Sequence, residues 1–166
     1  MELEKQKDKS IEQVNEYREK VLNFEQELLD SGLAITGEEF DKVNPLKHKF
    51  ADGCYIREIF MPAKELVISK IHKKLHPYFI LKGKLSILTE DGVQYIEAPY
   101  SGITKPGTKR VLYMHEDTIF VTVSVTDKTD IKEIEDEVIA KDFQDPLITK
   151  ADLDLLKNKK IWHLQH

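Results

Sequence analysis

Two histidines four residues apart are the most chemically informative feature of the sequence. His72 and His76 lie in the segment KIHKKLHPYFILKG, which continues into an apolar run. Two neutral imidazoles at this spacing can serve as ligands of a divalent transition metal such as Zn, Fe, Ni or Mn, although a usable site needs at least a third ligand. They can equally be ordinary polar side chains that face a cavity. The choice between these alternatives depends on the secondary-structure elements that carry the two histidines.

The histidines belong to a run of short predicted β-strands. From about residue 54 the apolar residues alternate with a period of two, and turn signals such as TEDG and KPGT separate the segments. Six or more short strands with no helix between them predict an antiparallel sandwich or barrel. The predicted strands lie in the segments CYIREIFMPA, ELVISKIHKK, YFILKGKLSIL, VQYIEAP, KRVLYMH and TIFVTVSV.

Strand alternation predicts which side chains share a face. Successive residues of a strand point to opposite sides of the sheet. Lys70 and His72 therefore fall on one face of their strand, and His76 and Tyr78 on one face of the next segment. If both faces point into a barrel, the two imidazoles meet at its mouth.

A helical pattern precedes the strands. Ser10 stands before the first apolar residue of SIEQVNEYREKVLNFEQELLDSG, and Gly32 follows its last turn, as helix caps do. The apolar residues of this segment form one stripe, which either packs on the rest of the same domain or forms a dimer arm. The stripe consists of Val14, Tyr17, Val21, Phe24 and Leu28.

Two more helices are predicted after the strands. Asp130 with Glu133, and Thr149 with Asp152, have the spacing of capping boxes. The chain is thus divided into an N-terminal helical arm (1–45), a β-barrel (46–127) and a C-terminal helical segment (128–166).

The strand pattern, KIHKKLHPYFILKG and KPGTKRVLY together resemble a single-domain cupin, a small double-stranded β-helix barrel of the jelly-roll type. The first cupin motif is a glycine, five residues, His-x-His, three or four residues, a glutamate, six residues and a glycine. Gly83 matches the closing glycine, which places His76 at the glutamate position and His72 at the second histidine. Lys70 stands at the first histidine position, and Lys64 at that of the opening glycine.

The second cupin motif is also incomplete. It contains Pro-x-Gly, two residues, a histidine and, four residues later, an asparagine. Gly107 matches, but Lys105 holds the proline position because Pro106 lies one residue further on. Arg110 stands where the metal-binding histidine belongs, and Met114 where the asparagine belongs. Of the four usual ligand positions, two can bind a metal and two carry a positive charge.

A narrower resemblance extends over more of the chain. The segments FADGCYIREIFMPA, KIHKKLH, GKLSILTEDG, PGTKRVLYMHEDT and IEDEVIA look like small cupin-like proteins of bacteriophages. This resemblance implies a viral protein in the cytoplasm of a bacterial host, with a role in the virion or toward a host protein.

Composition excludes several other classes. The net charge is −5, and the lysines and arginines form no basic stripe, which argues against nucleic-acid binding. Cys54 is the single cysteine, so no intrachain disulfide can form. The N-terminus is too charged for a signal peptide, and no apolar run reaches the roughly 20 residues of a membrane span. We therefore expect a cytoplasmic protein without membrane attachment.

The two basic residues at ligand positions favour an anion over a metal. A guanidinium can bind a carboxylate or phosphate with two hydrogen bonds, and fixed positive charges repel a divalent cation. We predict a non-enzymatic, self-associating cupin-like protein, a homo-oligomer, with a small anionic ligand in the barrel. The predicted ligand-binding residues are Lys70, His72, His76, Tyr78 and Arg110.

Two alternatives stay open at this stage. In the first, the protein is a metal-dependent cupin enzyme, an isomerase or oxygenase, with His72 and His76 as metal ligands. In the second, both histidines are structural, Lys70 and Arg110 pair with acids such as Glu58, and the protein works through its surface.

Overall fold

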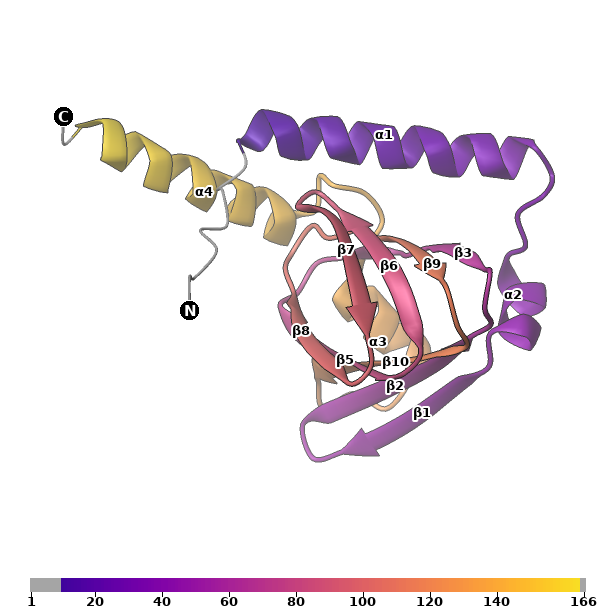
Figure 1. Cartoon of the computed structure of the whole chain (residues 1–166). Coiled ribbons are helices and arrows are strands. Elements are labelled where there is room, and N and C mark those ends of the chain that lie inside the picture. The colour runs from indigo at the N-terminus through magenta and orange to yellow at the C-terminus, as the bar shows by residue number, and fades with distance from the viewer. Residues whose placement is uncertain (1–9, 165–166) are drawn as a thin grey trace.

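The fold is mainly antiparallel β-structure, with helices at both ends of the chain (Figure 1). The computed structural model describes residues 10–164, with side chains described for residues 10–156. Within this range the strands are β1 (Leu46–Ala51), β2 (Cys54–Met61), β3 (Leu66–Ile68), β4 (Ile71–His72), β5 (His76–Lys82), β6 (Lys84–Thr89), β7 (Gly92–Glu97), β8 (Tyr100–Thr104), β9 (Val111–Met114), β10 (Thr118–Val125) and β11 (Ile139–Ala140). The helices are α1 (Ile11–Asp30), α2 (Gly37–Val43), α3 (Ile131–Val138) and α4 (Pro146–Leu164).

The strands form two main sheets with jelly-roll connectivity. One sheet has the order β1-β2-β10-β5-β8 and the other the order β3-β9-β6-β7, and all pairs are antiparallel. From β2 onward the chain crosses repeatedly from one sheet to the other, which winds the two sheets around a common interior. The predicted double-stranded β-helix is confirmed. Strand β1, which forms a hairpin with β2, was not predicted.

Alternation along these strands fills the interior with apolar side chains. In the five-stranded sheet Ile59, Phe120 and Ile80 lie side by side in register on the inner face. Leu85 and Met114, both fully buried, face them from the other sheet. The complete cluster of buried residues is Ile59, Met61, Tyr78, Ile80, Leu85, Ile87, Ile96, Leu112, Met114 and Phe120.

Helix α1 packs on the outside of the barrel. Ser10 caps it with the predicted box, since its hydroxyl accepts a hydrogen bond from the amide of Gln13 and the Gln13 side chain accepts one from the Ser10 amide. Val14 and Val21 are 8% and 3% exposed. The Tyr17 hydroxyl donates to the carbonyls of Leu88 (3.1 Å) and of the segment before β9. Val14, Tyr17 and Val21 of the stripe therefore pack on their own domain, which was the first of the two alternatives, whereas Phe24 of the same stripe is 37% exposed.

Helix α4 begins earlier than predicted. The carboxylate of Asp145 accepts a hydrogen bond from the amide of Leu147 (2.9 Å), and Pro146 occupies the first helical position, where a missing amide hydrogen costs nothing. Thr149 lies inside the helix, so the predicted cap at this residue is wrong. The predicted cap of α3 is confirmed, because the Asp130 side chain accepts from the Glu133 amide.

Helix α3 and strand β11 lie next to the strand that carries His72. Strand β11 pairs with β4, with Ile139 opposite His72, and the amide of Lys73 donates to the carbonyl of Val138 (3.0 Å). Ile134 of α3 is 1% exposed. Because the backbone of this segment is hydrogen-bonded to β4, it borders the site on the side of β4.

Glu137 at the end of α3 holds this segment by electrostatic contacts. Its carboxylate lies 2.8 Å from Nζ of Lys74 and 3.4 Å from Nζ of Lys128, and accepts a hydrogen bond from the Thr126 hydroxyl (2.9 Å). The hydrogen bond from Lys74, followed by that from Thr126, lowers the pKa of Glu137 to about 2 from an ordinary value of 4.5.

We expect the contribution of Glu137 to stability to be lost in acid. Its pKa is depressed in the folded state, so its contribution is complete above pH 4.5 and disappears as the pH falls toward 2. Unfolding in denaturant between pH 6 and pH 2 measures this contribution. The Glu137→Gln variant should have a lower free energy of unfolding at pH 6 and approach the parent protein near pH 2. A constant difference across this range would contradict the assignment.

Candidate functional site

The two histidines meet inside one end of the barrel, as predicted. Their ring centroids lie 4.9 Å apart with the rings tilted by 53°. His72 is partly buried on β4, and His76 is 6% exposed at the start of β5. The Nδ1 atom of His76 lies 3.0 Å from the Lys74 carbonyl, and it must donate there because a carbonyl oxygen only accepts. The buried Nε2 atom of His76 has no hydrogen-bond partner among the residues that the structure describes.

Lys70 does not join the histidines. Its side chain is 62% exposed and its Nζ atom pairs with Glu135 at 3.0 Å. The predicted alternation fails because β3 ends at Ile68 and β4 begins at Ile71, so the two residues between them shift the parity. As a result Val67, rather than its neighbours, packs on the core. Lys70 lines a different pocket, of about 380 Å³, between α1, β3, β4 and the α3–β11 segment.

Arg110 lies inside the barrel, at the start of β9. It is 4% exposed, and its guanidinium carbon stands 4.8 Å from the centroid of the Tyr78 ring and 5.8 Å from that of Phe120. Its Nη2 atom donates a hydrogen bond to the Thr104 hydroxyl. Because Thr104 is directly opposite His76 in the pairing of β5 with β8, the guanidinium and the imidazole share one corner of the interior.

Tyr78 forms the wall beneath this corner. It is 7% exposed and stacks on Phe120, with ring centroids 5.2 Å apart and ring planes 11° apart. Burial raises the pKa of the Tyr78 hydroxyl to about 12, so the phenol is neutral at physiological pH. Of the predicted ligand-binding residues, the structure therefore brings together His72, His76, Tyr78 and Arg110.

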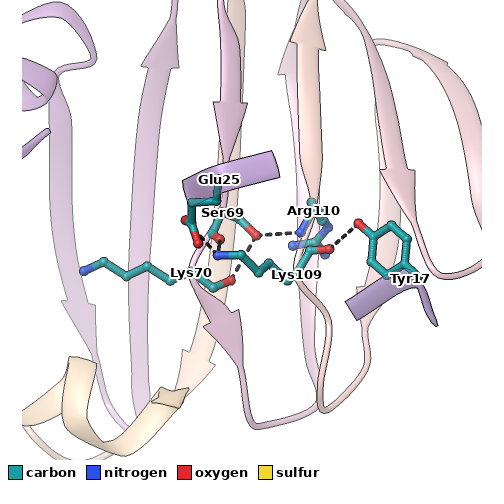
Figure 2. A network of polar contacts seen from close by, with 6 residues as sticks. All are labelled: Tyr17, Glu25, Ser69, Lys70, Lys109 and Arg110. Carbon is teal, nitrogen blue, oxygen red and sulfur yellow. Dashed lines mark hydrogen bonds and ion pairs between the residues drawn. The ribbon is translucent and has the colours of Figure 1, made fainter. Parts of the chain in front are cut away.

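A network of hydrogen bonds fixes the backbone that carries Arg110 (Figure 2). Its amide donates to the Ser69 hydroxyl (2.8 Å), and its carbonyl accepts from the Ser69 amide (2.9 Å). The preceding residue, Lys109, is 4% exposed and its Nζ atom contacts Glu25 of α1 (3.0 Å) and the Ser69 carbonyl (2.8 Å). Tyr17 of α1 donates to the Lys109 carbonyl (2.7 Å). Helix α1 thus holds this segment from outside, and Figure 2 shows Lys70 extending away from it.

Arg57 is a site residue that the sequence analysis missed. It lies on β2 at the same parity as Tyr55 and Ile59, which are 5% and 6% exposed, so it faces the interior. It is opposite Thr122 of β10, which is in turn opposite Tyr78. Among the residues with described side chains Arg57 makes no ion pair, and burial lowers its pKa. An arginine on the apolar face of CYIREIFM was the signal that could have revealed it.

Burial, reinforced by the positive charges of the site, keeps its histidines neutral. Burial, followed by the charge of Arg110, lowers the pKa of His72 well below 6.5, and His76, Arg57 and Lys109 act in the same direction. Burial also lowers the pKa of His76, a change that its hydrogen bond to Lys74 partly offsets and the charge of Arg110 reinforces. The interior therefore combines two guanidinium groups with two neutral imidazoles.

These residues do not fit a divalent metal. His72 and His76 supply two nitrogen donors, and no group of three or more His, Cys, Asp or Glu residues with metal-binding geometry occurs in the described part of the chain. His115, a more distant candidate, contacts the Ser86 hydroxyl at 2.8 Å, and its ring lies against Tyr113 and Tyr95. Repulsion from a nearby guanidinium costs a doubly charged ion on the order of a few kcal/mol. The arrangement favours an anion.

The strand order of the two sheets defines the class of the fold: it is a double-stranded β-helix of antiparallel strands, and the site residues lie on its inner face. No protein-family model and no curated protein sequence matches the chain. None of the helices within residues 10–164 has the length and apolar character needed to span a membrane.

Several solved structures are similar over part of the chain. They include the cupin domain of an XRE family transcriptional regulator from Enterobacter cloacae (10% identity, 52% of this chain and 99% of that chain, TM-score 0.44). An HTH_3 family transcriptional regulator from Vibrio cholerae is similar over 53% of each chain (13% identity, TM-score 0.44). A salicylate 1,2-dioxygenase from Pseudoaminobacter salicylatoxidans is similar over 74% of this chain and 35% of that chain (10% identity, TM-score 0.48). This chain thus spans about half of the Vibrio regulator and about a third of the dioxygenase. Function has to be argued from the site.

Proposed function

We propose that this protein is a non-enzymatic cupin-fold protein that binds a small anion inside the barrel. The observation that carries the proposal is Arg110, which is 4% exposed and makes no contact ion pair with a described carboxylate, the charge of Glu90 acting on it only from further away. A buried charge without a counter-ion is costly, and proteins keep such groups mainly where a ligand supplies the opposite charge. Arg57 adds a second guanidinium that forms no contact ion pair in the same range of residues, although the charges of Glu135 and Asp41 act on it from a distance.

The chemistry of the site suits a carboxylate or a phosphate. A guanidinium presents its N–H groups in a planar fork that matches two oxygens of either group, and such charge-assisted hydrogen bonds are strong in a dry interior. The guanidinium carbon of Arg110 lies over the Tyr78 ring, and one N–H group donates to Thr104, so its other N–H groups are available to a ligand. Two guanidinium groups together favour a dianion over a monoanion.

Isothermal titration calorimetry on untagged protein tests the proposal. We expect phosphate, malate or citrate to bind with a dissociation constant below about 1 mM in low salt, which corresponds to about 4 kcal/mol of binding free energy. The Arg110→Ala variant should lose this binding and keep the fold by circular dichroism. If none of these anions binds, the proposal fails. Purified protein with near-stoichiometric metal that is lost in His72→Ala would instead support the metal-dependent enzyme.

The remaining predictions from the sequence concern assembly and origin. We propose that the chain self-associates, that it derives from a bacteriophage, and that it works in the host cytoplasm or in the virion. Val21 is 3% exposed within its own domain, so the buried side of α1 is not free to form a dimer seam. Light scattering on the purified protein measures the oligomeric state directly.

A further inference from the structure

We infer that the ligand of this barrel is a hydroxy acid: a small dicarboxylate that carries a hydroxyl group beside one carboxylate. The inference rests on the proposed function and adds to it the group that the ligand must offer to His76. Its starting point is the Nε2 atom of His76, which is buried and has no hydrogen-bond partner within the described residues.

The tautomer of His76 decides what this atom can bind. The Nδ1 atom carries the proton because it donates to the Lys74 carbonyl at 3.0 Å. The ring is neutral, since burial and the charge of Arg110 both disfavour a second proton. In a neutral imidazole with Nδ1 protonated, Nε2 is an acceptor only. It therefore needs a donor, and a fully ionised carboxylate has none.

The neighbours of His76 do not supply that donor. The Thr104 hydroxyl, directly opposite on β8, accepts the Arg110 hydrogen bond and keeps its own proton, but it makes no hydrogen bond to the imidazole. His72, whose ring centroid is 4.9 Å away, makes no hydrogen bond to Nε2 either. A buried acceptor left without a partner is unfavourable, so a ligand hydroxyl at this corner gains a hydrogen bond that no protein group makes.

The charges around the acceptor define the rest of the ligand. Arg110 shares the corner with His76 through Thr104, so a carboxylate bound to its guanidinium lies close to Nε2. A hydroxyl on the adjacent carbon is then within reach of this acceptor. Arg57, on β2, provides the second positive charge for a second carboxylate. Malate has these three groups, and succinate is the same dicarboxylate without the hydroxyl.

Comparison of malate with succinate tests the inference on the unmodified protein. We expect malate to bind about tenfold or more tightly than succinate in calorimetric titrations at the same pH and salt, because only malate satisfies the buried acceptor. Equal affinities would overturn the inference while leaving the anion site in place. Absence of binding by both would overturn the proposed function and this inference with it.

Two variants separate the roles of the groups. In His76→Phe the ratio of malate to succinate affinity should fall to about one, with succinate binding retained, because the acceptor is gone and the guanidinium groups remain. In Arg110→Ala both ligands should be lost. A ratio that stays at about ten in a folded His76→Phe protein would overturn the inference. Should His76→Phe not fold, nitrogen NMR of the histidine rings in the parent protein gives the answer, since an Nε2 signal that does not move with malate contradicts a hydrogen bond there.

Discussion

Replacement of Arg110 by methionine is expected to abolish anion binding and to raise the free energy of unfolding of the ligand-free protein by about 1–3 kcal/mol. Arg110 is 4% exposed and has one side-chain hydrogen bond, to Thr104, and no contact ion pair among the described residues, where the charge of Glu90 acts on it from further away. Methionine fills a similar volume against Tyr78 and Phe120 without a buried charge. Denaturant unfolding of both proteins in anion-free buffer measures the difference.

Arg18 offers a matched control for this result. It is also buried (8% exposed) and also stands over an aromatic ring, 4.8 Å from the centroid of Phe143. Unlike Arg110, it forms a two-pronged ion pair with Asp152 (2.8 and 3.1 Å). Removal of one partner of a buried pair leaves the other charge unpaired, so Arg18→Met should destabilise the protein by about 3–5 kcal/mol. If Arg110→Met destabilises the protein as Arg18→Met does, Arg110 has a structural role and the anion site is wrong.

The expected changes in the free energy of unfolding have opposite signs for Arg110→Met and Arg18→Met. This difference distinguishes an arginine that binds a ligand from one that stabilises the fold. An arginine that stabilises the fold has its counter-ion within the chain. An arginine kept for a ligand lacks that counter-ion and makes the empty protein less stable than it could be. Anion binding should therefore raise the melting temperature of the parent protein and leave that of Arg110→Met unchanged.

The fold could be predicted from the sequence because its signals are local. A period of two in segments such as TIFVTVSV and the cap at Ser10 depend on near neighbours along the chain, and both predictions are confirmed. The approach of His72 and His76 was also predictable, since it follows from parity on two segments that are close in sequence. These local patterns predict the structure correctly because the tertiary packing requires the same strands and the same helix start.

The rest of the site depends on features that no local pattern contains. The outward position of Lys70 results from a break between β3 and β4, where Ser69 bonds to the backbone of Arg110, 41 residues later in the chain. The start of α4 at Pro146 rather than Thr149 depends on Asp145, whose carboxylate accepts a hydrogen bond from the Leu147 amide. Arg57 was missed for a different reason. From the sequence alone, a charged residue on an apolar strand face is only an interruption of the alternating pattern. Its role becomes visible when its neighbours across the sheet are known.

The two buried histidines should make the stability of the protein depend on pH. We expect the free energy of unfolding to fall as the pH is lowered from 7 to 5. The pKa values of His72 and His76 are depressed in the folded state, whereas both approach 6.5 in the unfolded chain. Below pH 6.5 the unfolded chain therefore binds protons that the folded protein does not, and stability declines until the folded-state pKa values are reached. Each histidine contributes at most about 1.4 kcal/mol per pH unit.

Paired variants isolate this effect from the titration of carboxylates. His72→Asn removes one of the two buried rings, and its unfolding free energy should depend less steeply on pH between 7 and 5 than that of the parent protein. His76→Asn removes the other ring, and its unfolding free energy should also depend less steeply on pH than that of the parent. An unchanged slope in His72→Asn would show that His72 is protonated equally well in the folded and unfolded states, contrary to its position beside Arg110.

A saturating anion should remove much of this pH dependence. The charge of Arg110 is one of the causes that depress both histidine pKa values, and a bound carboxylate or phosphate compensates it. The pKa of His72 then rises toward 6.5, and the folded protein takes up protons when it binds the anion, whereas His76 stays neutral where its Nε2 accepts a ligand hydroxyl. Calorimetry in two buffers of different ionisation enthalpy measures that proton uptake. The same histidines and guanidinium groups determine both the slope of the unfolding free energy against pH and the proton uptake. Agreement between the two measurements would locate the anion beside these groups. Anion binding without proton uptake would place the anion elsewhere on the protein.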